Sequence, residues 1–100
     1  MGAKGYLFAE LTVHDHEVFY HEYMEKVRPI LESWEANFLI STNSPEVIEG
    51  KRLVPRVILL EFSTLKKARD FYYSEEYQSI IQLRFDASVA HLYIMEGCAG

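Results

Sequence analysis

The chain is 100 residues long, 49% hydrophobic and 14% aromatic, so it has the length of one domain and enough apolar side chains for a core. Its formal net charge of −5 argues against a nucleic-acid partner, because phosphates attract a basic surface. The one cysteine, Cys98, excludes an internal disulfide. There is no signal-peptide pattern and no apolar run of about 20 residues, so we expect residues 1–100 to form a single cytoplasmic domain that does not bind membranes.

The first part of the chain predicts a strand, a helix and a second strand. Residues 6–13 alternate between two faces, and one face carries the aliphatic side chains Leu7, Ala9, Leu11 and Val13. Asp15 is suited to cap the following helix, whose apolar stripe continues past a kink at Pro29. Residues 37–41 predict a short strand, which residues 47–48 extend after a bulge.

The second part predicts a strand, an interrupted helix and a last strand. Residues 56–62 form an apolar run, and Ser63 or Thr64 is suited to cap the helix that follows as far as residue 87. Ser74 interrupts this helix and restarts it with two acids in the new first turn, where the helix dipole favours negative charge. Residues 91–96 predict the last strand.

The order of these elements, βαββαβ, predicts a ferredoxin-like α+β fold, in which an antiparallel four-stranded sheet carries two helices on one face. A sheet with one wet face should alternate apolar and polar residues, but residues 57–60 are apolar on both faces. Tyr6 and Phe8 likewise lie opposite the aliphatic face of their strand. We therefore predict a two-fold homodimer in which a second copy covers the open sheet face.

The sequence resembles the family called domain of unknown function 1330, within the dimeric α+β barrel superfamily. The matching residues span nearly the whole chain: Gly5-Tyr6, Tyr23, Pro29, Glu49-Gly50, Glu61-Phe62-Ser63, Ala68, Phe71-Tyr72, Ser74, Glu76-Tyr77-Gln78, Arg84 and Glu96-Gly97. The resemblance implies that two sheets pair as a dimeric α+β barrel. The superfamily includes small monooxygenases, lactone isomerases and haem-binding proteins, so it implies no single activity. One departure is residues 34–37, where the resemblance leads us to expect a Gly-rich turn.

Arg84 is the first candidate for a catalytic residue. It follows Tyr77, Ile80 and Ile81 at helical spacing, which places it on the inward stripe of its helix. A buried guanidinium needs an acceptor, and this acceptor is either a carboxylate of the protein or an anionic ligand. The structural alternative is an arginine near a helix C-terminus whose charge reaches solvent.

Glu10 and Glu61 are two further candidates, because their strands are central neighbours in this topology. If their faces coincide, the two carboxylates lie opposite or diagonal, within about 5–8 Å, and one pKa is raised to give an acid–base pair. The alternative is that each glutamate ends its strand at the wet rim of the barrel.

The candidate ligand-binding residues are aromatic or imidazole side chains near these groups: Phe8, Tyr23, Tyr72, Tyr77 and His91. The tyrosines have the spacing of core residues, although a hydroxyl that enters a cavity could anchor a ligand. His91 shares a face with Tyr93 and Met95, so it is either a base or haem ligand in the barrel or a buried histidine bonded to a neighbour. Glu17 and His21 lie one helical turn apart, but we expect surface histidines and no metal site.

These features predict a small homodimer that binds a small organic ligand and needs no cofactor. One form of this hypothesis is a cofactor-free acid–base enzyme of the isomerase type, with its pocket between sheet and helices or inside the dimer barrel. The alternatives are a non-catalytic ligand sensor or assembly module, and a cofactor-free monooxygenase. The residues leave open whether the protein is an enzyme.

Overall fold

The computed structural model describes residues 2–98, which form one sheet covered by one layer of helices. The strands are β1 (Gly5–Val13), β2 (Asn37–Thr42), β3 (Arg56–Phe62) and β4 (Ser88–Glu96). The helices are η1 (Glu17–Tyr23), α1 (Met24–Ser33), α2 (Leu65–Tyr73), α3 (Glu75–Gln78) and α4 (Ile81–Ala87). The strands are antiparallel in the order β2-β3-β1-β4, which confirms the predicted ferredoxin-like α+β fold.

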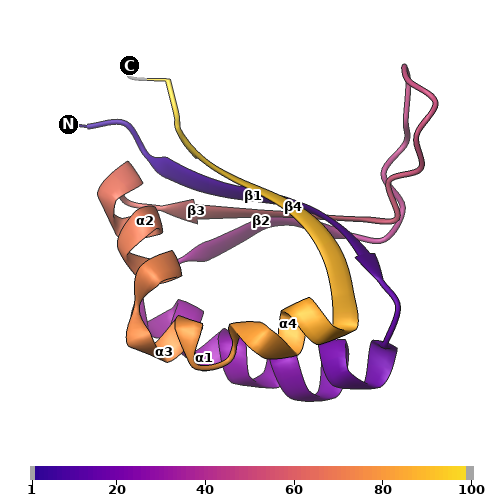
Figure 1. Cartoon of the computed structure of the whole chain (residues 1–100). Helices are drawn as coiled ribbons and strands as arrows, with labels where there is room; N and C mark the ends of the chain where they lie inside the picture. Colours follow the sequence, from indigo (N-terminus) through magenta and orange to yellow (C-terminus); the bar gives the residue numbers. More distant parts are fainter. Residues whose placement is uncertain (1, 99–100) are drawn as a thin grey trace.

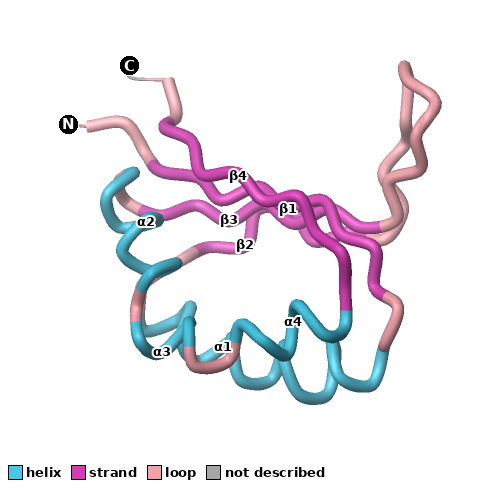
Figure 2. Tube along the Cα trace, in the orientation of Figure 1, coloured by secondary structure: helices cyan, strands magenta, loops and turns pink. Residues whose placement is uncertain are grey.

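All helices lie on one face of the sheet, and the other face has no helix over it (Figures 1 and 2). The core lies between the two layers, where β1 and β3 present alternate apolar side chains: Leu7, Ala9, Leu11, Ile58, Leu60 and Phe62. Among the fully buried side chains, the largest that the helices contribute are Phe19 and Phe71. Between β2 and β3, residues 43–55 form an arm that projects beyond the sheet on the side away from the helices (Figure 1).

The first helical segment differs from the predicted α-helix, because η1 is a π-helix. The carboxylate of Asp15 accepts a hydrogen bond from the backbone N–H of Val18 at 3.1 Å, as expected of a cap. The π-helix directs Phe19 and Tyr23 into the core, and α1 then continues past Pro29 as predicted. π-Helical segments are rare and occur often at functional sites, so Tyr23, the last residue of η1, is a candidate functional residue.

The end of α1 explains how the chain turns without the expected glycine. Glu35 donates its N–H to the carbonyl of Glu32, and Ala36 donates to the carbonyl of Leu31, both at 3.0 Å. These two bonds form a Schellman motif, whose middle position requires a left-handed backbone. Glu35 occupies that position with φ +57°, where a Cβ atom is unfavourable.

Replacing this residue, Glu35→Gly, should therefore stabilise the protein by roughly 1 kcal/mol, since glycine has no Cβ. We expect the thermal midpoint to rise by about 4–8 °C in differential scanning calorimetry. Glu35→Ala is the control, because it removes the carboxylate and keeps the Cβ. An equal gain in both variants would assign the effect to charge and contradict the backbone explanation.

The second helical segment is interrupted twice. The hydroxyl of Thr64 accepts a hydrogen bond from the N–H of Lys67 at 3.0 Å and caps α2. Ser74 accepts one from the N–H of Tyr77 at 3.2 Å and restarts the chain as α3, as predicted. A second break at residues 79–80 separates α3 from α4. This break was not predicted, because no glycine or proline marks it in the sequence.

Two predicted boundaries were wrong. The last strand begins at Ser88 and not at residue 91, because α4 passes into β4 without a loop. The hydroxyl of Ser88 donates to the carbonyl of Arg84 at 2.7 Å, and Ser88 pairs with Val13 in the sheet. Residues 47–48 do not extend β2; they belong to the irregular arm. Across residues 2–98, no helix combines the length and the apolar character needed to cross a bilayer.

Candidate functional site

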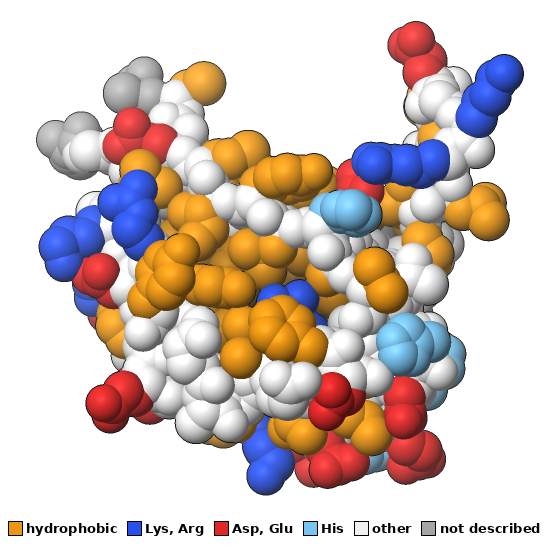
Figure 3. Space-filling model, in the orientation of Figure 1, with side chains coloured by type: hydrophobic (Ala, Val, Ile, Leu, Met, Phe, Trp, Pro, Cys, Tyr) orange, Lys and Arg blue, Asp and Glu red, His pale blue; other side chains and the backbone are white. Residues whose placement is uncertain are grey.

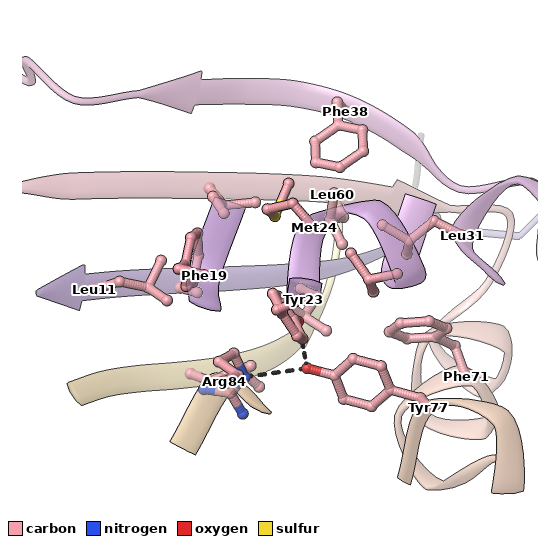
Figure 4. Close-up of a pocket in the computed structure, with 15 residues that line it drawn as sticks. Leu11, Phe19, Tyr23, Met24, Leu31, Phe38, Leu60, Phe71, Tyr77 and Arg84 are labelled. Carbon is pink, nitrogen blue, oxygen red and sulfur yellow. Dashed lines mark hydrogen bonds between the residues drawn. The ribbon is translucent and has the colours of Figure 1, made fainter. Parts of the chain in front are cut away.

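A cavity of about 40 Å³ lies inside the domain, between the sheet and the helix layer. Its walls are apolar side chains from β1, β2, β3, η1, α1 and α2, among them Leu11, Phe19, Leu31, Phe38, Leu60 and Phe71 (Figure 4). On the surface, hydrophobic side chains gather in a hollow between sheet and helices, and Lys or Arg atoms are visible at its floor (Figure 3). A cavity of this size has room for a few water molecules or one small polar group.

One corner of this cavity is polar, and three helices build it. The hydroxyl of Tyr77, in α3, lies 2.7 Å from the hydroxyl of Tyr23 at the end of η1. Arg84, in α4, donates from its Nε to the same Tyr77 oxygen at 3.1 Å (Figure 4). The break between α3 and α4 and the π-helix of η1 are thus the two local features that bring these side chains together.

Arg84 is buried, with 6% of its surface exposed, and yet no acidic side chain of the described residues pairs with it. In residues 2–98, the ion pairs join Arg52 to Glu10 and Lys66 to Asp70, and no carboxylate reaches Arg84. Its guanidinium carbon lies 5.1 Å from the centre of the Phe85 ring. Burial alone lowers the pKa of Arg84, but the oxygens of Tyr77 and Tyr23 outweigh it and the pKa is raised, so the group stays charged.

A count of protons shows what this corner lacks. Each tyrosine hydroxyl supplies one proton, and the contact between Tyr23 and Tyr77 uses one of the two. The other hydroxyl proton and the terminal N–H groups of Arg84 have no hydrogen-bond acceptor among the described residues. The corner therefore offers donors and one positive charge to whatever enters the cavity, which is the chemistry that binds an oxyanion.

The tyrosine pair should also make the stability of the fold depend on alkaline pH. Burial, followed by the proximity of Tyr77, raises the pKa of Tyr23 well above its usual value of 10. Folding therefore favours the neutral form of Tyr23, and this preference stabilises the folded protein below pH 10. The stabilisation is lost as the pH rises through the folded-state pKa of Tyr23. We expect the urea midpoint to fall above pH 10, and to fall less steeply in Tyr23→Phe. Tyr73→Phe, an exposed control, should retain the steep fall.

A wider groove of about 400 Å³ lies on the surface beside the cavity, between α2 and β4. Its lining consists of Arg69, Tyr72, Tyr73, Leu92 and Ile94. Leu92 lines both the groove and the inner cavity, and the Tyr72 ring lies 5.6 Å from that of Tyr77. Tyr72 was among the predicted ligand-binding residues, whereas Arg69 and Leu92 were not, because only tertiary packing brings α2 against the edge strand β4.

The other candidates, Glu10, Glu61, Phe8 and His91, lie on the open face of the sheet, away from Arg84. Tyr6 is opposite Glu61, and Val57 is opposite Glu10, so the two glutamates are separated by four residues along the strands, about 13 Å. The predicted close carboxylate pair was therefore wrong, because the register of β1 and β3 offsets them.

Each glutamate on this face has its own partner. Glu61 accepts from the hydroxyl of Tyr6 at 3.0 Å, which raises the pKa of that tyrosine, and Glu10 pairs with Arg52 at 2.7 Å. His91 lies opposite Glu10 and is exposed. The prediction of a buried histidine was therefore wrong for the single subunit. Within residues 2–98, no three His, Cys, Asp or Glu side chains come together as a possible metal site.

A second buried arginine, Arg56, was absent from the sequence-based candidates. The alternation of β3 could have revealed it, because Arg56 shares the buried face with Ile58, Leu60 and Phe62. Its terminal nitrogens donate to Asn43 at 2.7 Å and to Ser41 at 2.8 Å, and its guanidinium lies 5.6 Å from the centre of the Tyr20 ring. Its terminal groups are thus occupied by the protein, in contrast to those of Arg84.

Known structures share this fold at low sequence identity. A protein of unknown function from Rhodopseudomonas palustris, RPA0582, superposes with a TM-score of 0.77 and 11% identity over 100% of this chain and 86% of its own. SnoaB, a cofactor-independent oxygenase from Streptomyces nogalater, superposes with a TM-score of 0.64 and 8% identity, and the match covers 98% of this chain and 96% of SnoaB. A nipsnap family protein of unknown function from Agrobacterium tumefaciens superposes with a TM-score of 0.56 and 16% identity, and the match covers 96% of this chain and 89% of that protein.

These similarities establish the fold of the dimeric α+β barrel proteins, and at such identities they establish nothing more. No curated protein matches the sequence. The sequence does match a family described as Domain of unknown function (DUF1330), over residues 4–98. The resemblance drawn from scattered residues is thereby confirmed, and the chain belongs to the DUF1330 family.

Proposed function

We propose that this protein is a homodimer that binds a small organic ligand in the space between its sheet and its helix layer. The observation that carries the proposal is Arg84, a buried arginine that lines an apolar cavity and pairs with no carboxylate of residues 2–98. Arg84 also lies in the last turn of α4, where a positive charge is favourable, but neither this position nor the hydrogen bond to Tyr77 uses its terminal N–H groups, which stay available to a ligand. Apolar walls with a few converging polar groups are the usual composition of a ligand site.

Arg84, Tyr23 and Tyr77 are the polar residues of this site, and Tyr72 contributes to the neighbouring groove. The free hydroxyl proton of the tyrosine pair could be transferred to a bound ligand, which supports acid–base chemistry such as isomerisation. One relative in fold is a cofactor-independent oxygenase, so reaction with oxygen is the alternative chemistry for an electron-rich ligand in the same cavity. A sensor would bind the ligand and release it unchanged.

A thermal-shift screen of metabolites in parallel on wild type and Arg84→Gln tests the proposal. We expect at least one compound to stabilise the wild type and to lose its effect in the variant. Recovery of that compound by mass spectrometry after incubation, with oxygen uptake recorded, then separates isomerase, oxygenase and sensor. A screen in which no compound acts through Arg84 would refute the proposal.

We propose that the open face of the sheet forms the interface of the homodimer. It exposes Val89, Tyr93 and Met95, and Phe8 stacks on Tyr93 with ring centres 6.2 Å apart. The arm of residues 43–55 projects on the same side and exposes Leu53 by 91% (Figure 1). Apolar surface of this kind on one face indicates a protein partner, and a two-fold partner presents the same face. In this assignment, Glu10, Glu61 and His91 belong to the interface.

We therefore expect Tyr93→Asp to weaken the dimer by roughly 30-fold or more, since truncating a central interface tyrosine typically costs about 2 kcal/mol and the new charge adds desolvation. Sedimentation equilibrium measures the change. Tyr73→Asp is the matched control, because Tyr73 is even more exposed but lies on the helix side. Equal weakening in both variants, or a wild-type monomer at micromolar concentration, would contradict the assigned interface.

A further inference from the structure

We infer that the ligand carries one oxyanion, a carboxylate or an acidic phenol or enol, on a flat aromatic body. The oxyanion lies at Arg84 in the inner cavity, and the body lies in the groove between α2 and β4. This inference rests on the proposed function, since it specifies the chemical class that the same site would take.

The charge lining both compartments supports an anion. The whole chain carries 15 acidic and 10 basic residues, yet no Asp or Glu of the described residues lines the inner cavity or the groove. Both compartments contain an arginine, Arg84 in the cavity and Arg69 in the groove. An anion would therefore meet positive charge at the mouth and at the inner end, on a protein whose overall charge of −5 repels it elsewhere.

The hydrogen-bonding groups at the inner end select an oxyanion over a neutral carbonyl. The terminal nitrogens of Arg84 form a planar fork that matches two carboxylate oxygens. The free hydroxyl proton of the Tyr23–Tyr77 pair is a further donor. The acceptors that the described side chains offer at this corner are the two tyrosine oxygens, which already share one hydrogen bond and take another from Arg84, and no carboxylate lines the cavity. A ligand amide or amine therefore finds fewer partners here than an oxyanion does.

The two volumes divide the ligand into a small polar end and a larger body. The inner cavity of about 40 Å³ takes a group of a few atoms, whereas the groove of about 400 Å³ has the size of sites that hold whole small molecules. The groove is lined by Tyr72 and Tyr73 on α2, by Leu92 and Ile94 on β4, and by the charged side chain of Arg69. A flat aromatic body can stack on the tyrosine rings of such a lining.

Leu92 lies at the boundary of the two compartments, since among the described residues it alone lines both. It is therefore the side chain that must move aside, or that shapes the neck, when a ligand spans the groove and the cavity. Its neighbour Ile94 faces the same way on β4 but lines the groove alone, so the strand supplies its own matched comparison.

Isothermal titration calorimetry on the full chain tests the inference with three probes: 2-naphthoate, the neutral 2-naphthamide, and acetate. We expect 2-naphthoate to bind the wild type about 10–100-fold more tightly than 2-naphthamide, the factor that a charge-assisted hydrogen bond provides. This preference should disappear in Arg84→Gln. Acetate should bind much more weakly than 2-naphthoate, because it leaves the groove empty. In stopped-flow fluorescence, Leu92→Ala should speed the association of 2-naphthoate several-fold, whereas Ile94→Ala should not.

The outcomes separate this inference from the proposed function. If the amide and the carboxylate bind equally and both need Arg84, the cavity binds ligands but the oxyanion is refuted. If the preference for carboxylate survives in Arg84→Gln, the anion lies elsewhere and the inference fails. Acetate binding as tightly as 2-naphthoate, or equal effects of the two β4 variants, would refute the role of the groove. The wild-type comparison of the two naphthyl probes needs no variant, so it holds even if Arg84→Gln fails to fold.

Discussion

Gly5→Ala should destabilise the protein by about 3 kcal/mol or more, although it adds one methyl group at the start of β1. A Cβ atom at Gly5 would lie 2.2 Å from the carbonyl oxygen of Thr64 and 2.6 Å from the Cα of Leu65. Both are backbone atoms, so no side-chain rotation relieves the overlap and the strand must separate from the N-terminus of α2. We expect the thermal midpoint to fall by more than 10 °C, at about 4–8 °C for each kcal/mol.

Gly2→Ala is the control for this substitution, because a Cβ at Gly2 meets no atom within 4 Å. Both variants lower the entropy of the unfolded chain in the same way, so their difference isolates the steric contact. If Gly5→Ala melted within 2 or 3 °C of Gly2→Ala at equal protein concentration, roughly the shift of half a kcal/mol, the close approach of β1 to α2 would be wrong.

The alternation of β1 and β3 predicted the fold because each strand has one buried face, and burial is a local property of the sequence. Leu7, Ala9 and Leu11 were expected on one face, and all three are buried against the helices. The caps at Thr64 and Ser74 were also predictable, since a side-chain oxygen caps an N–H only three residues away. The π-helix and the break at residues 79–80 have no such local mark.

The candidate site was predictable only where one helical stripe defines it. Tyr77 and Arg84 are seven residues apart, and this spacing correctly placed both on the inward side. The pair of Glu10 and Glu61 failed because a register between strands 50 residues apart depends on the packing of the whole sheet. The meeting of Leu92 and Tyr72 at one groove likewise joins α2 to the edge strand β4, which no local pattern specifies.

Arg84→Met should raise the stability of the unliganded protein and abolish ligand binding at the same time. Removing the charge removes its desolvation penalty, and a methionine of similar length can fill the same space. Buried charges replaced by packed apolar residues stabilise proteins by up to about 1–4 kcal/mol, and we expect about 1–2 here, because Arg84 loses its hydrogen bond to Tyr77 and its contact with Phe85. The Tyr77 hydroxyl keeps Tyr23 as a partner, so no buried polar group is left alone.

Arg56→Met provides the matched comparison, because Arg56 is as buried as Arg84, with 7% against 6% exposed. Its removal loses two charge-assisted hydrogen bonds, to Asn43 and Ser41, and the contact with the Tyr20 ring, and it also removes the buried Nε, which has no partner among the described residues. The loss outweighs the relief, so we expect a net cost of about 1–2 kcal/mol. Calorimetric midpoints should therefore move in opposite directions in the two variants. Opposite shifts of the two midpoints are expected if Arg56 stabilises the fold, whereas Arg84 destabilises it and is retained to bind a ligand. A fall of similar size in both would make Arg84 structural and remove the main support for a ligand site.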